Sequence, residues 1–92
     1  MGTVVRIAPL LQEHLRIPAR VEVRGKTIGE CLRDLIRQYP EVREWLLGRN
    51  DLLRVFISTN NEEMLVMNRK SDMDRMVDPS DEILILAILS GG

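Results

Sequence analysis

The chain ends in Ser90-Gly91-Gly92, and this terminus is the part of the sequence best suited to chemistry. A free carboxylate is a poor electrophile, so a reaction at Gly92 would first require an added leaving group. Glycine has no Cβ and adopts dihedral angles closed to other residues, so Gly91 and Gly92 could thread a narrow channel in another protein. At ordinary glycine usage, a chance Gly-Gly ending occurs in roughly one chain in 200. The ending therefore becomes a specific signal only behind a matching fold.

Two other side chains could be reactive, and each has a simpler explanation. Cys31 lies on the apolar stripe of a predicted helix, where a buried thiol behaves as a small hydrophobe. His14 stands alone in a predicted loop, without a second histidine or a cysteine nearby. The sequence has no CxxC, GxGxxG or Walker loop. We therefore predict a protein that is not an enzyme, acts by being bound, and holds no cofactor or metal of its own.

Size and charge exclude several function classes. The 92 residues predict a single domain, 1–92. A formal net charge of −1, from 13 basic and 14 acidic residues, argues against a nucleic-acid-binding protein. The longest apolar run, Ile83–Leu89, is too short to span a membrane, and Met1–Thr3 does not resemble a signal peptide. We therefore expect a cytoplasmic location.

One long helix is predicted between residues 27 and 40. Thr27 and Glu30 have the spacing of a capping box, which satisfies free amides at a helix start. Apolar residues then recur at three- and four-residue steps and form one stripe, while Pro40 ends the helix. The stripe comprises Ile28, Cys31, Leu32, Leu35, Ile36 and Tyr39. A short second helix is expected at Glu41–Leu47.

Alternating or continuous apolar patterns predict the strands. The expected strands are Thr3–Ala8, Arg20–Arg24, Leu53–Thr59, Glu63–Met67 and Glu82–Leu89, with a polar loop at Asn68–Asp78. Pro9 is expected to weaken continuation of the first strand. Met73 and Met76 are expected to anchor the polar loop, and most of Met64, Met67, Met73 and Met76 to fill gaps in the core. The last strand has seven consecutive apolar residues and no polar face, which is typical of a central strand parallel to a neighbour. A parallel pair needs a crossover, and the long helix can supply it. The sequence therefore predicts an α+β fold, with a mixed sheet of four to five strands packed on one main helix.

On these features the chain resembles the MoaD/ThiS sulfur carriers, relatives of ubiquitin with a β-grasp fold, over nearly its whole length. The segments that carry the resemblance are Val4-Val5-Arg6-Ile7, Thr27-Ile28-Gly29-Glu30, Leu32-x-x-Leu35, Gln38-Tyr39-Pro40, Val55-Phe56-Ile57, Asp81-Glu82-Ile83 and Gly91-Gly92. The resemblance implies that an ATP-dependent, E1-like adenylyltransferase adenylates the Gly92 carboxylate. A sulfur donor would then convert it to a thiocarboxylate, and the sulfur would pass to an acceptor enzyme, such as a large synthase subunit in molybdopterin or thiamine-like cofactor biosynthesis.

The sequence departs from the family pattern in two places. Many relatives have a proline-containing stretch before the final glycines, where this chain has Ala87-Ile88-Leu89-Ser90. The loop at 59–63 also lacks the glycine often found there. These departures leave the acceptor pathway open. Two alternatives remain: a ubiquitin-like modifier joined to lysines through the same terminus, and a non-catalytic β-grasp binding module.

The last strand also predicts a docking surface. Alternate residues of a strand point to opposite faces, and one helix can cover only one face of the sheet. By resemblance to the carriers, we assign Leu84, Leu86 and Ile88 to the open face. An apolar patch on an open face usually marks a partner site, and this one lies directly before the terminus.

Overall fold

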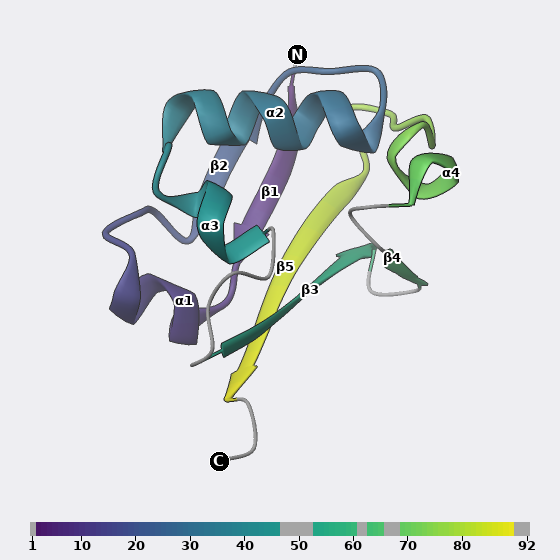
Figure 1. The fold of residues 1–92 in the computed structure, drawn as a ribbon. Coiled ribbons are helices and arrows are strands. Elements are labelled where there is room, and N and C mark those ends of the chain that lie inside the picture. The colour runs from purple at the N-terminus through teal and green to yellow at the C-terminus, as the bar shows by residue number, and fades with distance from the viewer. Residues whose placement is uncertain (1, 47–52, 61–62, 66–68, 90–92) are drawn as a thin grey trace.

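A computed structural model describes residues 2–46, 53–60, 63–65 and 69–89 of the protein. The elements follow one another as β1 (Thr3–Ile7), α1 (Pro9–His14), β2 (Arg20–Val23), α2 (Ile28–Gln38), α3 (Val42–Leu46), β3 (Leu53–Thr59), β4 (Glu63–Leu65), α4 (Lys70–Met73) and β5 (Glu82–Leu89) (Figure 1). None of the described helices is long and apolar enough to cross a membrane. The predicted α+β class and the predicted order of strands and long helix are confirmed.

The strands form one mixed sheet in the order β2-β1-β5-β3-β4. β5 is central: it runs parallel to β1, with Val5 opposite Ile83, and antiparallel to β3, with Ile57 opposite Ile85. β1 and β2 form the early antiparallel pair. The prediction of a central strand parallel to a neighbour is therefore confirmed, since β5 lies between two hydrogen-bonded strands.

Helix α2 begins as its sequence predicts. The Glu30 amide donates to Thr27 Oγ1 over 3.1 Å, so Thr27 caps the helix. The Glu30 carboxylate accepts from the amide of Lys26 over 2.9 Å, one residue before the amide that a standard capping box would satisfy. The helix ends at Gln38, with Tyr39 in a non-helical conformation directly before Pro40.

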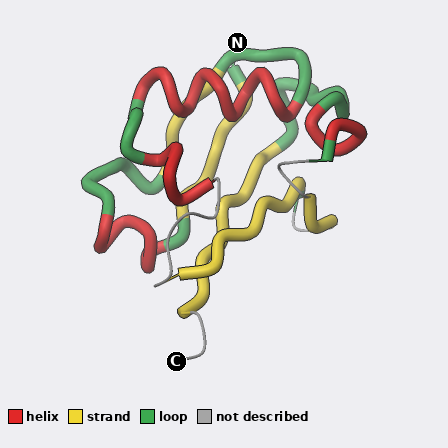
Figure 2. The backbone as a smooth tube through the Cα atoms, in the orientation of Figure 1, coloured by secondary structure: helices red, strands yellow, loops and turns green. Residues whose placement is uncertain are grey.

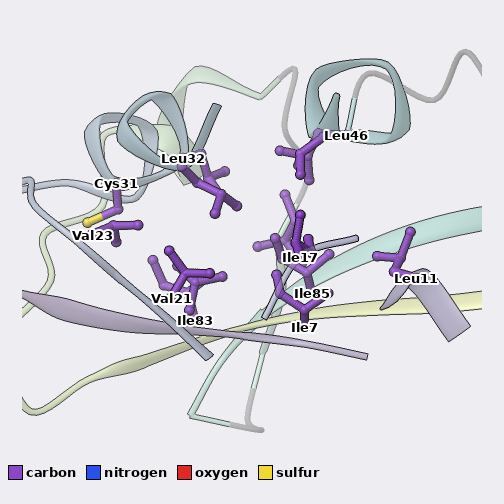
Figure 3. Close-up of a cluster of buried hydrophobic side chains, with 14 of the residues drawn as sticks. Ile7, Leu11, Ile17, Val21, Val23, Cys31, Leu32, Leu46, Ile83 and Ile85 are labelled. Carbon is purple, nitrogen blue, oxygen red and sulfur yellow. The ribbon is translucent and has the colours of Figure 1, made fainter. Parts of the chain in front are cut away.

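The core lies between the helices and one face of the sheet. Figure 3 shows Cys31 of α2 beside Val23, and Leu46 of α3 above Ile17 and Ile85, with Leu32 of α2 between them pointing toward the strands. The fully buried side chains are Leu11, Ile28, Leu32, Leu35, Ile83, Ile85, Val5, Val23 and Cys31. The predicted stripe of α2 is therefore the face that packs on the sheet, although Ile36 and Tyr39 at its edge are only partly buried.

The segment after β1 differs from the prediction. Pro9 was expected only to weaken the strand, and His14 was placed in a loop; instead Pro9 opens helix α1, and His14 lies in its last turn. Proline suits a first helical turn because its fixed φ is helical and its missing amide would have no partner there. Leu11 then anchors the helix, with 2% of its surface exposed. The assignment of His14 to a loop is wrong.

The predicted polar loop at 68–78 also contains structure. Lys70–Met73 form helix α4, and Asp74 is its C-cap residue. Met73 is partly buried against the core, as expected, whereas Met76 is 68% exposed and does not anchor the segment. Gly29 allows α2 and α4 to approach each other closely, because a Cβ placed there would lie 3.2 Å from the Met73 carbonyl oxygen. Met64 and Met67, also expected as core residues, have side chains outside the described part of the chain.

A carboxylate on α2 ties this helix to the edge strand β2 and makes the stability pH-dependent. Asp34 accepts from the Arg24 amide over 3.0 Å and from Arg37 Nε over 2.9 Å, and Gln38 donates to the carbonyl of Glu22. The Arg24 amide, with help from the Arg37 guanidinium, holds the pKa of Asp34 below its ordinary value of 3.8. Because the folded pKa is depressed, the stabilisation is present above the unfolded pKa and is lost as pH falls through the folded pKa.

We therefore expect Asp34→Asn to lower stability at neutral pH and to reduce the further loss on acidification to about pH 3. Urea unfolding midpoints across this pH range measure both effects. Glu13→Gln, on an exposed position of α1, is the matched control. A parallel pH profile for Asp34→Asn and the parent would contradict the assignment.

Candidate functional site

The predicted reactive residues Ser90, Gly91 and Gly92 lie outside the described residues, but the structure places the point where they begin. Pairing of β5 with β1 stops at Ile85, whereas pairing with β3 continues to Leu89, opposite Leu53. The last four residues of β5 therefore extend past β1 in a two-stranded ribbon with β3 (Figure 2). Three residues follow Leu89, and they can reach at most about 10 Å from it.

Strand β5 divides its side chains between the two faces of the sheet. Ile83 and Ile85 are 0% and 1% exposed and belong to the core. Leu84 and Leu86 alternate with them, are only partly buried and do not belong to the core cluster. The predicted faces of these four residues are therefore correct. Ile88 continues the open-face register opposite Arg54, but its side chain lies outside the described part of the structure.

Neighbouring strands extend this apolar surface. Phe56 of β3 is the partner of Leu86, and Val4 of β1 shares the face of Leu84; both are partly buried. We call Val4, Phe56, Leu84 and Leu86 the open-face patch. Leu86 and Phe56 lie on the ribbon that precedes the terminus. The patch is therefore continuous with the base of the tail.

Charged side chains border the patch on its β1 side. Arg6 Nη1 lies 3.4 Å from Glu82 Oε2, and both side chains are about half exposed. Such an exposed pair contributes little to stability because water screens it. It does place one cation and one anion beside Leu84, at the edge of the patch.

The other side chains singled out in the sequence do not assemble with the tail. Cys31 is completely buried, its Sγ lies 3.7 Å from the carbonyl oxygen of Gly25, and burial raises the pKa of its thiol. A protonated, inaccessible thiol is a poor nucleophile, so the packing role fits. His14 lies beside Trp45, with ring centroids 5.4 Å apart. Within the described ranges, no group of His, Cys, Asp and Glu side chains could hold a metal ion.

Sequence reasoning missed two features of the site. It did not include Phe56 in the docking surface, and it did not foresee that the ribbon extends beyond β1. Both depend on the β3–β5 register, which pairs Phe56 with Leu86. A signal was present, because Val55, Phe56 and Ile57 are consecutive apolar residues in a strand that must also have an open face.

A mixed sheet whose last strand is central and parallel to the first, with one long crossover helix, defines a ubiquitin-like β-grasp protein. No protein-family model matches the chain, and no curated protein matches its sequence. Solved structures do match. The chain is similar to SAMP1, the small archaeal modifier protein 1 of Methanosarcina acetivorans, with a TM-score of 0.71 and 20% identity, over 99% of this chain and 96% of that one.

Two further matches are bacterial. CysO of Mycobacterium tuberculosis, described as an antigen, matches with a TM-score of 0.69 and 22% identity over 92% of this chain and 97% of that one. A chain of the BexX/CysO complex of Amycolatopsis orientalis matches with a TM-score of 0.64 and 20% identity over 99% and 100%. These similarities confirm the predicted β-grasp fold over essentially the whole chain.

Proposed function

We propose that the protein is a sulfur carrier whose Gly92 carboxylate is adenylated and converted to a thiocarboxylate. The observation that carries this proposal is the β5–β3 ribbon, which runs past β1 and is followed by three small residues ending in Gly91-Gly92. A strand paired up to Leu89 gives the terminus a defined starting point, and two glycines would let it enter a narrow active site.

The chemistry follows from the weakness of a carboxylate as an electrophile. A Gly92 carboxylate oxygen attacks the α-phosphorus of ATP, and pyrophosphate leaves. Hydrosulfide, or an equivalent donor, then attacks the carbonyl carbon of the acyl adenylate, and AMP leaves. The carrier contributes no catalytic side chain, so an E1-like adenylyltransferase supplies the catalysis. The protein would work in the cytoplasm and deliver its sulfur to an acceptor enzyme of cofactor biosynthesis, in a molybdopterin or thiamine-like pathway.

The adenylyltransferase and the acceptor enzyme would both need to bind the carrier beside its terminus. The open-face patch is suited to this because it is apolar, partly exposed and continuous with the base of the tail. The existence of a BexX/CysO complex shows that a neighbour in fold associates with another protein. We propose the open-face patch, extended by Ile88, as the docking site for the adenylyltransferase and for the acceptor enzyme.

Protein modification is the second candidate, favoured by the similarity to a small archaeal modifier protein. In that case a lysine amine of a target protein attacks the acyl adenylate, AMP leaves and an amide forms. A binding module with an inert tail is the third. All three share the fold and differ only in what happens to Gly92.

Intact-mass measurement separates these candidates. The full-length protein is incubated with ATP, the E1-like adenylyltransferase from the same organism and sulfide. Replacement of one oxygen by sulfur supports the carrier, and conjugates of higher mass support the modifier. An unchanged mass, in a reaction where the adenylyltransferase activates a known carrier, would contradict both proposals.

The docking proposal predicts the effect of Leu86→Asp. A carboxylate in the middle of an apolar interface loses its water without gaining a partner, so affinity for the adenylyltransferase should fall about 30-fold or more, or about 2 kcal/mol. Folding should change much less, because Leu86 lies outside the core. Calorimetric titration and a melting curve on the same sample measure the two effects.

Met76→Asp is the matched control, since it adds the same charge at a residue that is 68% exposed and away from the patch. It should bind like the parent. If Leu86→Asp also bound like the parent and melted normally, the patch would not be the docking site.

A further inference from the structure

The protein has few groups that an activated acyl carbon could acylate. Its only lysines are Lys26 and Lys70, both exposed, and the other eleven basic residues are arginines. A guanidinium stays protonated and does not serve as an acyl acceptor under ordinary conditions. The thiol of Cys31 is buried. The third amine is the α-amino group of the chain, which precedes Thr3 of β1 by two residues. The positions of these three amines therefore decide whether an activated Gly92 can react with its own chain.

Lys26 lies at the end of the sheet where β5 begins. It follows the last residue of β2, Val23, which pairs with Thr3 at the start of β1. β1 is parallel to β5, so the two strands start at the same end of the sheet. The amide of Val77, shortly before β5, donates to the carbonyl of Lys26 over 3.0 Å.

Lys70 lies at the same end. It is the first residue of α4, which packs against the first turn of α2 at Gly29. The amide of Ile28 in that turn donates to the carbonyl of Arg75, just after α4, over 2.9 Å. Figure 1 shows α4 and the start of α2 at the end of the molecule opposite the arrowhead of β5.

The length of β5 separates both lysines from the terminus. Eight residues of strand span about 23 Å, and the three residues after Leu89 reach back at most about 10 Å. The remaining gap of about 13 Å is longer than a lysine side chain, and longer than the reach of about 7 Å from Thr3 at the start of β1 to the α-amino group two residues before it. A fully extended tail is the most favourable case, so any other path leaves a wider gap.

We infer that the activated terminus cannot acylate its own folded chain, and that self-conjugation occurs only between copies, at Lys26, Lys70 or the α-amino group. In that reaction the amine nitrogen of one copy attacks the Gly92 carbonyl carbon of another, the leaving group departs with its electron pair, and the amine loses a proton to water. The fold thus protects the activated carrier from self-inactivation until a partner arrives. This inference rests on the proposed function only in that an activated Gly92 forms.

The test uses a chemically made thioester, so it does not depend on the adenylyltransferase. The full chain is produced with a C-terminal alkyl thioester by intein thiolysis and incubated in mildly alkaline buffer. Cyclisation gives a product lighter by one water than the hydrolysed chain, and intact mass distinguishes the two. A group tethered nearby has an effective concentration of about 1 mM, so cyclisation should outpace coupling between copies about 100-fold at about 10 µM protein.

Arg54→Lys is the matched variant. Arg54 pairs with Ile88, one residue before the end of β5, so the substitution keeps the charge and introduces an amine at a backbone position beside the end of β5. We expect cyclisation in folded Arg54→Lys and in the urea-unfolded parent, but none in the folded parent. At high concentration the folded parent should form covalent dimers linked at Lys26, Lys70 or the α-amino group, and the double variant Lys26→Arg/Lys70→Arg should keep only the links at the α-amino group.

Two results would overturn the inference. One is cyclisation of the folded parent at the rate of Arg54→Lys. The other is a parent that stays linear both folded and unfolded while Arg54→Lys also stays linear, since lysine position would then not control the reaction. Failure of the proposed function would appear instead as an unchanged mass with ATP, adenylyltransferase and sulfide.

Discussion

Deleting Gly92 should abolish adenylation and sulfur transfer while leaving the fold unchanged. The acyl carbon that reacts would then belong to Gly91, displaced by one residue, or about 3.5 Å, from the position that the adenylyltransferase holds beside ATP. Misplacement on this scale is sufficient to remove the near-attack geometry on which such reactions depend. The fold should persist because the last pairing of β5 is at Leu89, before the deleted residue.

Replacing Gly91 with phenylalanine tests whether the tail must pass through a narrow channel in the adenylyltransferase, and it leaves the length of the tail unchanged. The carboxylate keeps its position in the sequence, but a bulky side chain precedes it, so activation should again be lost. ATP–pyrophosphate exchange and intact mass measure activation, and a melting curve measures folding. Met76→Ala, at an exposed residue at the far end of the molecule, is the control for handling and expression.

The two variants distinguish the candidate functions. A sulfur carrier and a protein modifier should both fail when the tail is altered, since they share the activation step. A Gly92 deletion that still supports sulfur transfer at the parent's rate would contradict the carrier proposal directly. An inert module would bind its partner unchanged in both variants.

The parts of the fold that were predictable have strong local signals. Seven apolar residues in a row identify β5 as central, and the Thr27–Glu30 spacing identifies the start of α2, because in each case one short segment contains the whole cause. Helix α1 has no such signal. From the sequence, Pro9 predicts only a weakened strand, whereas the same residue is also favourable at a first helical turn, and packing of Leu11 against the core decides between the two.

In the candidate site, too, some features have a local sequence signal and others depend on tertiary structure. Alternation along β5 separates Leu84 and Leu86 from Ile83 and Ile85, but alternation alone does not say which pair faces the helix. The resemblance made that choice, and the burial of Ile83 and Ile85 agrees with it. Strand register adds information that no single segment contains, because it is register that places Phe56 beside Leu86.

The largest effect on stability should come from Leu35→Ala. Leu35 is completely buried in the middle of the α2 stripe, and truncating a buried leucine costs about 2–5 kcal/mol through lost burial and the cavity left behind. Domains of this kind are stable by only about 5–15 kcal/mol, so the variant loses a large share of its margin. Urea unfolding at neutral pH measures the loss as a shift in midpoint at constant slope.

Ile36→Ala is the matched control, because the neighbouring residue has a similar volume but is only partly buried. It should cost clearly less than Leu35→Ala. A loss well below about 1 kcal/mol for Leu35→Ala would show that the stripe does not pack the helix onto the sheet. Because the open-face patch lies across the sheet from Leu35, the folded fraction of this variant should still bind the adenylyltransferase with the parent's affinity. Leu86→Asp should show the reverse, with a nearly normal midpoint and weakened binding, so the two variants separate the face that stabilises the fold from the face proposed for docking.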